Sequence, residues 1–168
     1  MASITGLTPE DRLDIMDLYA RYAWAMDSAD LDAFVECYVP GGQLLDSHGA
    51  TEGEEAFRAW LSLFLGDSAF PGSQHFYTQW KMQADGPDAA TCNVYVVRMY
   101  QIPKTRNSQP IWQGYYTDDV RKVDGRWGFW RKRIHQAWEL FGTPPDQVKS
   151  DAAPPYVDRL HHHGVSLR

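Results

Sequence analysis

The hydrophobic period of the chain changes near Gln74, and this change constrains the fold more than any other feature of the sequence. Before residue 65, apolar side chains recur every three or four residues, as they do in helices that pack on one side. From Gln74 onward, apolar and polar residues alternate, as in the strands of an antiparallel sheet. Helices followed by strands exclude an alternating α/β fold. The order predicts an α+β domain with helices on one face of a curved sheet.

Three helices are expected in the first part of the chain. Thr8 is suited to cap the first helix, because its hydroxyl accepts from an amide of the first turn and the proline after it needs no donor there. Asp30 begins the second helix, which ends before Pro40-Gly41-Gly42. The segment Thr51-Glu52-Gly53-Glu54 has the spacing of a capping box and predicts the third. Residues 43–47 predict a short strand.

Four long strands are expected in the second part. Asp85-Gly86 and Asp124-Gly125 predict tight turns, because glycine accepts the positive φ that compact hairpins require, and residues 104–110 predict a longer polar loop. Aromatic residues make up 14% of the chain, more than its core needs, which favours a ring-lined cavity where a small molecule binds. The expected strands cover residues 74–83, 89–101, 111–122 and 126–138.

A single cavity domain is expected over residues 1–142, since a chain of 168 residues suits one core. The tail, residues 143–168, contains two Pro-Pro pairs and is expected to be irregular and to lie across the cavity mouth. Its His161-His162-His163 is interpreted as a surface feature. No apolar run approaches the roughly 20 residues that span a bilayer, and residues 1–8 lack a secretory pattern. These features predict a cytoplasmic protein that does not enter a membrane.

The charge of the chain argues against nucleic acid as a partner. The net charge is −6, so the chain lacks the basic surface that nucleic-acid binding requires. The basic run Arg131-Lys132-Arg133 is short and is interpreted as the solvated side of a strand. The motifs HExxH, GxxxxGK and GxGxxG do not occur. No cofactor or metal is therefore expected, and side chains have to supply the acid and the base.

Asp27 and His75 together predict such chemistry. A carboxylate where the first helix ends opposes the helix dipole unless another group uses its charge. The alternative is that Asp27 or Asp30 caps the next helix. His75 lies in an aromatic strand, where a lone histidine is more often a hydrogen-bonded structural residue. An aspartate that holds an imidazole in one tautomer, however, makes it a base near neutral pH, and a tyrosine hydroxyl can stabilise the resulting anion.

Five segments resemble the nuclear transport factor 2-like superfamily, in its polyketide-cyclase and dehydratase branch, over about residues 9–141. Within that branch the segments are most similar to scytalone dehydratase, and also to hexachlorocyclohexane dehydrochlorinase and bile-acid 7α-dehydratase. The resemblance implies a cone-shaped, curved antiparallel sheet with N-terminal helices that enclose a cavity. The segments are DLYARY at 17–22, WAMDSAD at 24–30, QHF at 74–76, GYYTD at 114–118 and DGRW at 124–127.

In those enzymes a helix-end aspartate and a strand histidine form the working pair, which implies Asp27 and His75 as catalytic residues here. The fold also serves isomerases, cyclases and proteins without catalysis, so it does not give the function by itself. Arg98 falls where scytalone dehydratase has a second histidine. Arginine cannot act as a general acid near neutrality, but it can bind an oxyanion. The alternative is an arginine on the outer face of its strand. Met26 replaces a phenolic donor of scytalone dehydratase.

Tyrosines and tryptophans supply the remaining candidates for substrate binding. Tyr22 holds the position of a tyrosine in the bile-acid enzyme, and Tyr116 that of an asparagine in scytalone dehydratase; packing explains each equally well. Asp46, near the place of a second scytalone dehydratase tyrosine, is a weaker candidate. Trp24 and Trp80 are expected to enclose the rings of the substrate.

His135 is a secondary candidate for substrate binding. It alternates with Trp127 and Phe129 and is therefore expected to point to the same side of the sheet as those rings. The period alone does not tell whether that side is the cavity or the outside.

The predicted function is a cofactor-independent lyase that eliminates water or a similar group from an aromatic or polycyclic small molecule. A carbon-carbon lyase that releases an aldehyde, or a double-bond isomerase or cyclase, fits the same residues. A ligand-binding or scaffold protein without catalysis is the alternative from another class. The resemblance also implies a homodimer or homotrimer.

Overall fold

The computed structural model describes residues 6–47, 49–67 and 73–137. The chain divides into two compact units, Met1–Gln136 and Ala137–Arg168. The tail predicted over residues 143–168, with its three histidines, lies outside the described residues. The first unit contains the helices α1 (Pro9–Ser28), α2 (Leu31–Val35) and α3 (Glu54–Asp67), and the strands β1 (Tyr38–Asp46), β2 (Gly49–Glu52), β3 (Ser73–Ala84), β4 (Ala89–Gln101), β5 (Ser108–Val123) and β6 (Arg126–Gln136).

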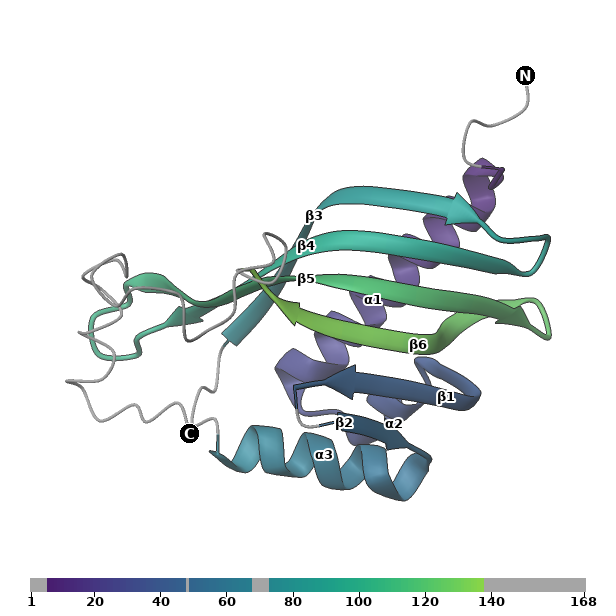
Figure 1. Ribbon diagram of the computed structural model, residues 1–168. Coiled ribbons are helices and arrows are strands. Elements are labelled where there is room, and N and C mark those ends of the chain that lie inside the picture. Colours follow the sequence, from purple (N-terminus) through teal and green to yellow (C-terminus); the bar gives the residue numbers. More distant parts are fainter. Residues whose placement is uncertain (1–5, 48, 68–72, 138–168) are drawn as a thin grey trace. The chain divides into compact units, whose positions relative to one another are not determined.

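The strands form one curved sheet in the order β2-β1-β6-β5-β4-β3. The pair β1 and β6 is parallel, and the other neighbours are antiparallel. Helix α1 crosses one face of this sheet, and α3 lies beside β2 (Figure 1). The prediction of an α+β fold with N-terminal helices and a curved sheet is confirmed, and the sheet is antiparallel except for the parallel pair β1 and β6.

Two of the three predicted helix starts and the turn at Asp124-Gly125 act as predicted, whereas Thr51 does not cap α3: it lies in β2, and the helix begins at Glu54. Thr8 caps α1 by accepting from the Asp11 amide at 3.0 Å. Asp30 caps α2 by accepting from the Ala33 amide at 3.0 Å. At the tight turn between β5 and β6, Asp124 and Gly125 have φ values of 50° and 78°, which favour glycine and asparagine-like residues.

The segment between α2 and α3 differs from the prediction. Pro40-Gly41-Gly42 does not end a helix but lies inside β1, where the parallel pairing with β6 shifts register between Tyr38 and Gln43. A side chain on Gly42 would collide with the Phe129 carbonyl, so the close approach of the two strands requires glycine there. The short strand β2 is an addition to the predicted elements, because its four residues carry no alternation.

The interior between α1 and the sheet is built from aromatic rings. Tyr19 packs edge-on against Tyr77, Trp80 and Phe129 with ring centroids 5.4, 4.8 and 5.1 Å away. Tyr22 packs against Phe129 in the same way at 5.5 Å. The helical face that the sequence marks as apolar is thus the face that meets the sheet.

A buried ion pair lies within this aromatic core. The Lys132 ammonium is 3.0 Å from Asp118 Oδ2, and both side chains are 0% exposed. The Tyr19 hydroxyl donates to the same oxygen at 2.5 Å. The ammonium also lies 3.8 Å from the ring centre of Tyr116 and 4.4 Å from that of Tyr22. The interpretation of Arg131-Lys132-Arg133 as a solvated run is therefore wrong at its central residue.

A β-bulge explains that error. The pairing of β5 with β6 shifts between Val120↔Phe129 and Asp119↔Arg131, so Trp130 is the extra residue. One extra residue exchanges the two faces for all later residues of the strand. Lys132 consequently turns inward beside Asp118, whereas uninterrupted alternation would have turned it outward.

No helix among the described residues has the length and apolar character needed to cross a lipid bilayer.

Candidate active site

The Asp27 carboxylate and the His75 imidazole meet where α1 ends beside β3. Asp27 Oδ1 is 2.6 Å from His75 Nδ1, and Oδ2 accepts from the His75 backbone amide at 2.9 Å. One carboxylate therefore holds both the ring and the main chain of the same residue. Because Asp30 supplies the cap of α2, Asp27 has no capping role there, and its charge is directed at His75 instead.

The pair is shielded from solvent. The His75 side chain is 3% exposed and the Asp27 side chain 17%. Burial lowers the pKa of His75 below its usual value of 6.5, although the hydrogen bond and the charge of Asp27 act in the opposite direction. An ionised carboxylate accepts the Nδ1 proton, which leaves the lone pair on Nε2. His75 is thus a neutral imidazole with its basic nitrogen directed away from Asp27.

Arg98 lies beside His75 on the same face of the sheet. The two residues are directly opposite each other in the pairing of β3 and β4, and opposite residues of an antiparallel pair share a face. The Arg98 Nη2 donates to Ser73 Oγ at 3.1 Å. Burial lowers the pKa of Arg98, while Tyr116 and Asp27 act against this shift. The alternative of an outward-facing Arg98 does not hold.

Three tyrosines extend the site into the core. Tyr77 follows His75 by two residues on the same face, with ring centroids 6.4 Å apart. It also lies 5.9 Å from Tyr116. Burial raises the pKa of both Tyr77 and Tyr116, and the charge of Asp118 adds more to this shift than the charge of Asp27 does. Burial likewise raises the pKa of Tyr22. All three phenols are thereby kept protonated, as hydrogen-bond donors.

Trp80 joins this group, and Trp24 does not. The register of β3 and β4 shifts between Thr78 and Lys81, where Gln79 has a φ of 55°, so Trp80 packs inward against Tyr77 at 6.0 Å. Trp24 is 75% exposed on the side of α1 that faces away from the core. This corrects the expectation that Trp24 encloses the substrate, because Trp24 lies on the opposite side of the helix from the buried face.

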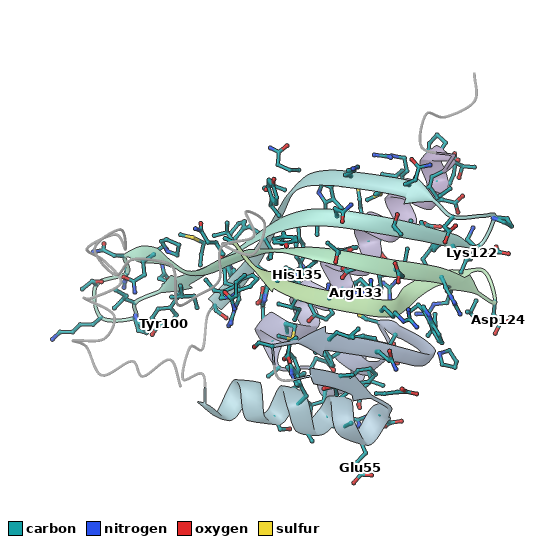
Figure 2. All side chains as sticks on the ribbon, viewed as in Figure 1. Glu55, Tyr100, Lys122, Asp124, Arg133 and His135 are labelled. Atoms are coloured by element: carbon teal, nitrogen blue, oxygen red, sulfur yellow. The ribbon has the colours of Figure 1, made fainter. Side chains whose placement is uncertain are left out.

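His135 also lies away from the pair. It is opposite Tyr115, next to the inward pair Tyr116↔Ile134, stacks on the Tyr115 ring at 4.6 Å and shares a hydrogen bond of 2.8 Å with Thr117 Oγ1. The bulge at Trp130 therefore places His135 on the outer face, not on the face of Trp127 and Phe129 as expected. Figure 2 labels its position on β6.

The remaining weak candidate, Asp46, accepts from the Trp60 indole at 2.9 Å. Sequence reasoning missed Tyr77, Asp118 and Lys132. Tyr77 carried a usable signal, since the period of two from His75 places it on the same face. No local signal marks Asp118 and Lys132, because their burial depends on the bulge.

Two surface hollows in the described part of the chain lie elsewhere. One surrounds the start of α3, from Glu52 to Ala56, and the other lies between β4, β5 and β6 beside Trp130. Neither contains Asp27 or His75. The ring-lined cavity beside the pair thus stays a prediction. In the same part of the chain, no three His, Cys, Asp or Glu side chains are placed to hold a metal ion together.

Comparison with known proteins identifies the family to which this fold belongs. The chain belongs to the SnoaL-like domain family, which matches residues 8–133, and its fold is that of the nuclear transport factor 2-like superfamily. No curated protein matches the chain.

Solved structures share this fold. A protein of unknown function with a cystatin-like fold from Nostoc punctiforme is 26% identical, with a TM-score of 0.68, and the match covers 76% of this chain and 92% of that one. A provisionally named scytalone dehydratase from Novosphingobium aromaticivorans is 19% identical (TM-score 0.65; 76% and 85% covered). LinA is 18% identical (TM-score 0.64; 74% and 84% covered).

Proposed function

We propose that this protein is a cofactor-independent lyase that uses His75 as the base and Asp27 to orient it. The substrate is an aromatic or polycyclic small molecule, and the reaction removes a proton and expels water or a comparable leaving group. The observation that carries the proposal is the two-point contact of Asp27 with His75, which leaves the basic Nε2 available.

The charges around the pair fit such a reaction. His75 Nε2 takes a proton from the substrate, and the developing anion is stabilised by Arg98 and by the phenols of Tyr22 and Tyr116. The rings of Tyr77 and Trp80 supply an apolar wall for the substrate. The protonated His75 then returns its proton to the leaving group, with Asp27 stabilising the imidazolium.

The family and its neighbours support a protein that converts a small molecule. Elimination of water, cleavage of a carbon-carbon bond and movement of a double bond all begin with the same proton transfer. We propose elimination first because the provisionally named scytalone dehydratase among the neighbours carries the name of that reaction. The same assay detects the two alternative reactions, which are carbon-carbon cleavage that releases an aldehyde, and isomerisation.

The test compares His75→Gln with His135→Gln, a matched control on the outer face. Each purified variant is incubated with a panel of hydroxylated aromatic compounds, and products are followed by mass spectrometry. We expect the parent and His135→Gln to turn over at least one compound and His75→Gln to lose about a hundredfold or more of that turnover. Equal turnover in the folded His75→Gln variant would eliminate His75 as the base. A parent inactive on every compound would favour the non-catalytic alternative.

We also propose that the protein forms a homodimer or homotrimer through the outer face of the sheet. Phe76 and Tyr95 are 49% and 46% exposed, and Tyr95 is opposite Tyr115 in the pairing of β4 and β5. Sedimentation of the parent and of Tyr95→Glu measures this directly. We expect an oligomer that the charged variant converts to a monomer; a monomeric parent would contradict the proposal.

A further inference from the structure

The solvent side of α1 carries an apolar stripe. Leu13, Met16 and Trp24 are 66%, 39% and 75% exposed, and they are three of the six large apolar side chains that are exposed among the described residues. Together with the exposed Ala20 they recur at intervals of three and four residues, so all four lie on one side of the helix. This side is opposite the face that packs on the sheet. We call these four residues the α1 stripe.

The α1 stripe makes α1 unusual for a helix at the surface of a domain. Such a helix normally has one apolar side, which meets the core, and one polar side, which meets water. In α1 the polar residues lie along the edges, between two apolar sides. An exposed, contiguous apolar surface is typical of an interaction site. Because the stripe is straight and about 16 Å long, its shape fits another helix.

Charges along one edge of the α1 stripe indicate what this other helix is. Asp17 and Arg21 form an ion pair of 2.9 Å there, between Oδ2 and Nε, with side chains 66% and 36% exposed. In an antiparallel copy related by a two-fold axis, the charged edges of both helices lie on the same side and run in opposite directions. Arg21 of each copy then lies beside Asp17 of the other, and the two helix dipoles oppose each other favourably. A parallel copy would place the two charged edges on opposite sides of the contact.

We propose that the α1 stripe binds the α1 stripe of a second copy of this chain, antiparallel and with Ala20 at the two-fold axis. The small side chain of Ala20 lets the helices approach closely at the centre of the contact. Met16 and Trp24 are each four residues from Ala20, so Met16 of one copy lies opposite Trp24 of the other. A thioether against an aromatic ring is a favourable contact.

The length of the α1 stripe limits how strong this contact is. Stable interfaces bury about 1,200–2,000 Å² in total, and two helices that meet over about 16 Å lie at or below the lower end of this range. We therefore expect the contact to be dissociated at about 5 µM and formed at about 200 µM. At the lower concentration, sedimentation detects only an oligomer formed through the outer face of the sheet.

The test is made in Tyr95→Glu, where the proposed contact through the sheet is removed. Added Ala20→Cys places a thiol at the two-fold axis, and added Asp14→Cys, at an exposed position of α1 outside the stripe, is the matched control. Helix axes about 8–10 Å apart bring the two copies of residue 20 within reach of a disulfide. At about 200 µM with oxidised glutathione, we expect at least about fivefold more disulfide-linked dimer from Ala20→Cys than from the control.

Two properties of the chain keep this assay specific. Cys37 and Cys92 are both 0% exposed, and burial raises their pKa values to about 11 and about 12, so they stay protonated and unreactive. Trp24→Glu, combined with Ala20→Cys, should reduce the linked dimer by about fivefold or more, because it would bury a charge against Met16 of the second copy. Circular dichroism checks that each variant is folded.

A second measurement identifies the other possible occupant of the α1 stripe, which is the chain itself. Iodoacetamide should modify Ala20→Cys rapidly at about 5 µM and more slowly at about 200 µM, because only a second copy gives protection that depends on concentration. Slow modification at both concentrations would mean that the same chain covers the stripe, and the proposal would be wrong. Equal cross-linking of Ala20→Cys and Asp14→Cys, or a Tyr95→Glu variant that sediments as a monomer at about 200 µM, would also overturn it.

These readouts are independent of the proposed function. They require no turnover, so the loss of the lyase proposal would leave the α1 contact unaffected. They also exclude the outer face of the sheet, because every variant carries Tyr95→Glu.

Discussion

Asp27 binds His75 twice, once at the imidazole Nδ1 at 2.6 Å and once at the backbone amide at 2.9 Å. The contact with the backbone amide holds β3 beside the end of α1. The contact with Nδ1 fixes the rotation of the imidazole ring. A single carboxylate thus sets both the position and the tautomer of the proposed base. A variant of Asp27 that keeps one of these two contacts therefore tests the role of the other.

Asp27→Asn is expected to impair the proposed reaction while largely preserving the fold. The amide oxygen of asparagine can still accept from the His75 backbone, but its NH₂ group cannot accept the Nδ1 proton, so the ring shifts to the wrong tautomer. We expect turnover to fall by about a hundredfold to ten-thousandfold, with little change in KM. Steady-state kinetics on a compound that the parent converts, with circular dichroism for folding, measures this. A KM effect alone would assign Asp27 to binding.

The stability of the protein should fall as the pH drops below about 6.5, in part through His75. Its pKa in the folded chain lies below the unfolded value of 6.5, because burial disfavours the charged ring. The unfolded chain therefore binds the proton more readily. The contribution of His75 is complete above pH 6.5 and is lost as the pH falls from there toward the folded pKa.

Urea unfolding of the parent and of His75→Gln across that pH range isolates this contribution. The slope of unfolding free energy against pH should be smaller in His75→Gln, whereas His135→Gln should retain the slope of the parent. Identical slopes in the parent and His75→Gln would mean that the pKa of His75 does not change on folding.

Lys132→Met should destabilise the protein by about 3–5 kcal/mol, since it leaves the buried Asp118 charge without its cation. The double variant Lys132→Met with Asp118→Asn removes both charges, and asparagine keeps a carbonyl for the Tyr19 hydroxyl. We expect the double variant to recover much of the loss in urea unfolding. Equal losses in the single and double variants would show that the ion pair itself, and not the stranded carboxylate, carries the stability.

Gly114→Ala should be one of the more damaging small substitutions in the sheet. Gly114 lies opposite Gln136 in the pairing of β5 and β6, and a Cβ there would collide with the His135 carbonyl and the Trp112 ring. We expect a loss of about 1–3 kcal/mol or more in urea unfolding. Gly125→Asn is the control, because nothing lies near a Cβ there and asparagine tolerates its positive φ. A loss as small as that of the control would show that the strands part to admit the methyl group.

Much of the fold followed from local signals. Thr8 and Asp30 cap their helices as expected, and the four long strands lie within a few residues of their predicted bounds. These features depend on the helical period, the strand period and turn chemistry, all of which act between residues close in the sequence. The pairing of Asp27 with His75 needed more, because 48 residues separate them. It was predicted from the chemistry of the two side chains and from the family resemblance, not from the period.

The sequence by itself determined the order of the elements and the apolar face of α1, and it predicted Asp27 and His75 as an acid-base pair. Only the tertiary structure decided which side chains of β3 and β6 enter the interior after the irregularities at Gln79 and Trp130. Each extra residue reverses the faces of the rest of its strand, so Trp80 and Lys132 turn inward and His135 turns outward. A bulge arises from the register between neighbouring strands, so the alternation of residues within one strand does not reveal it.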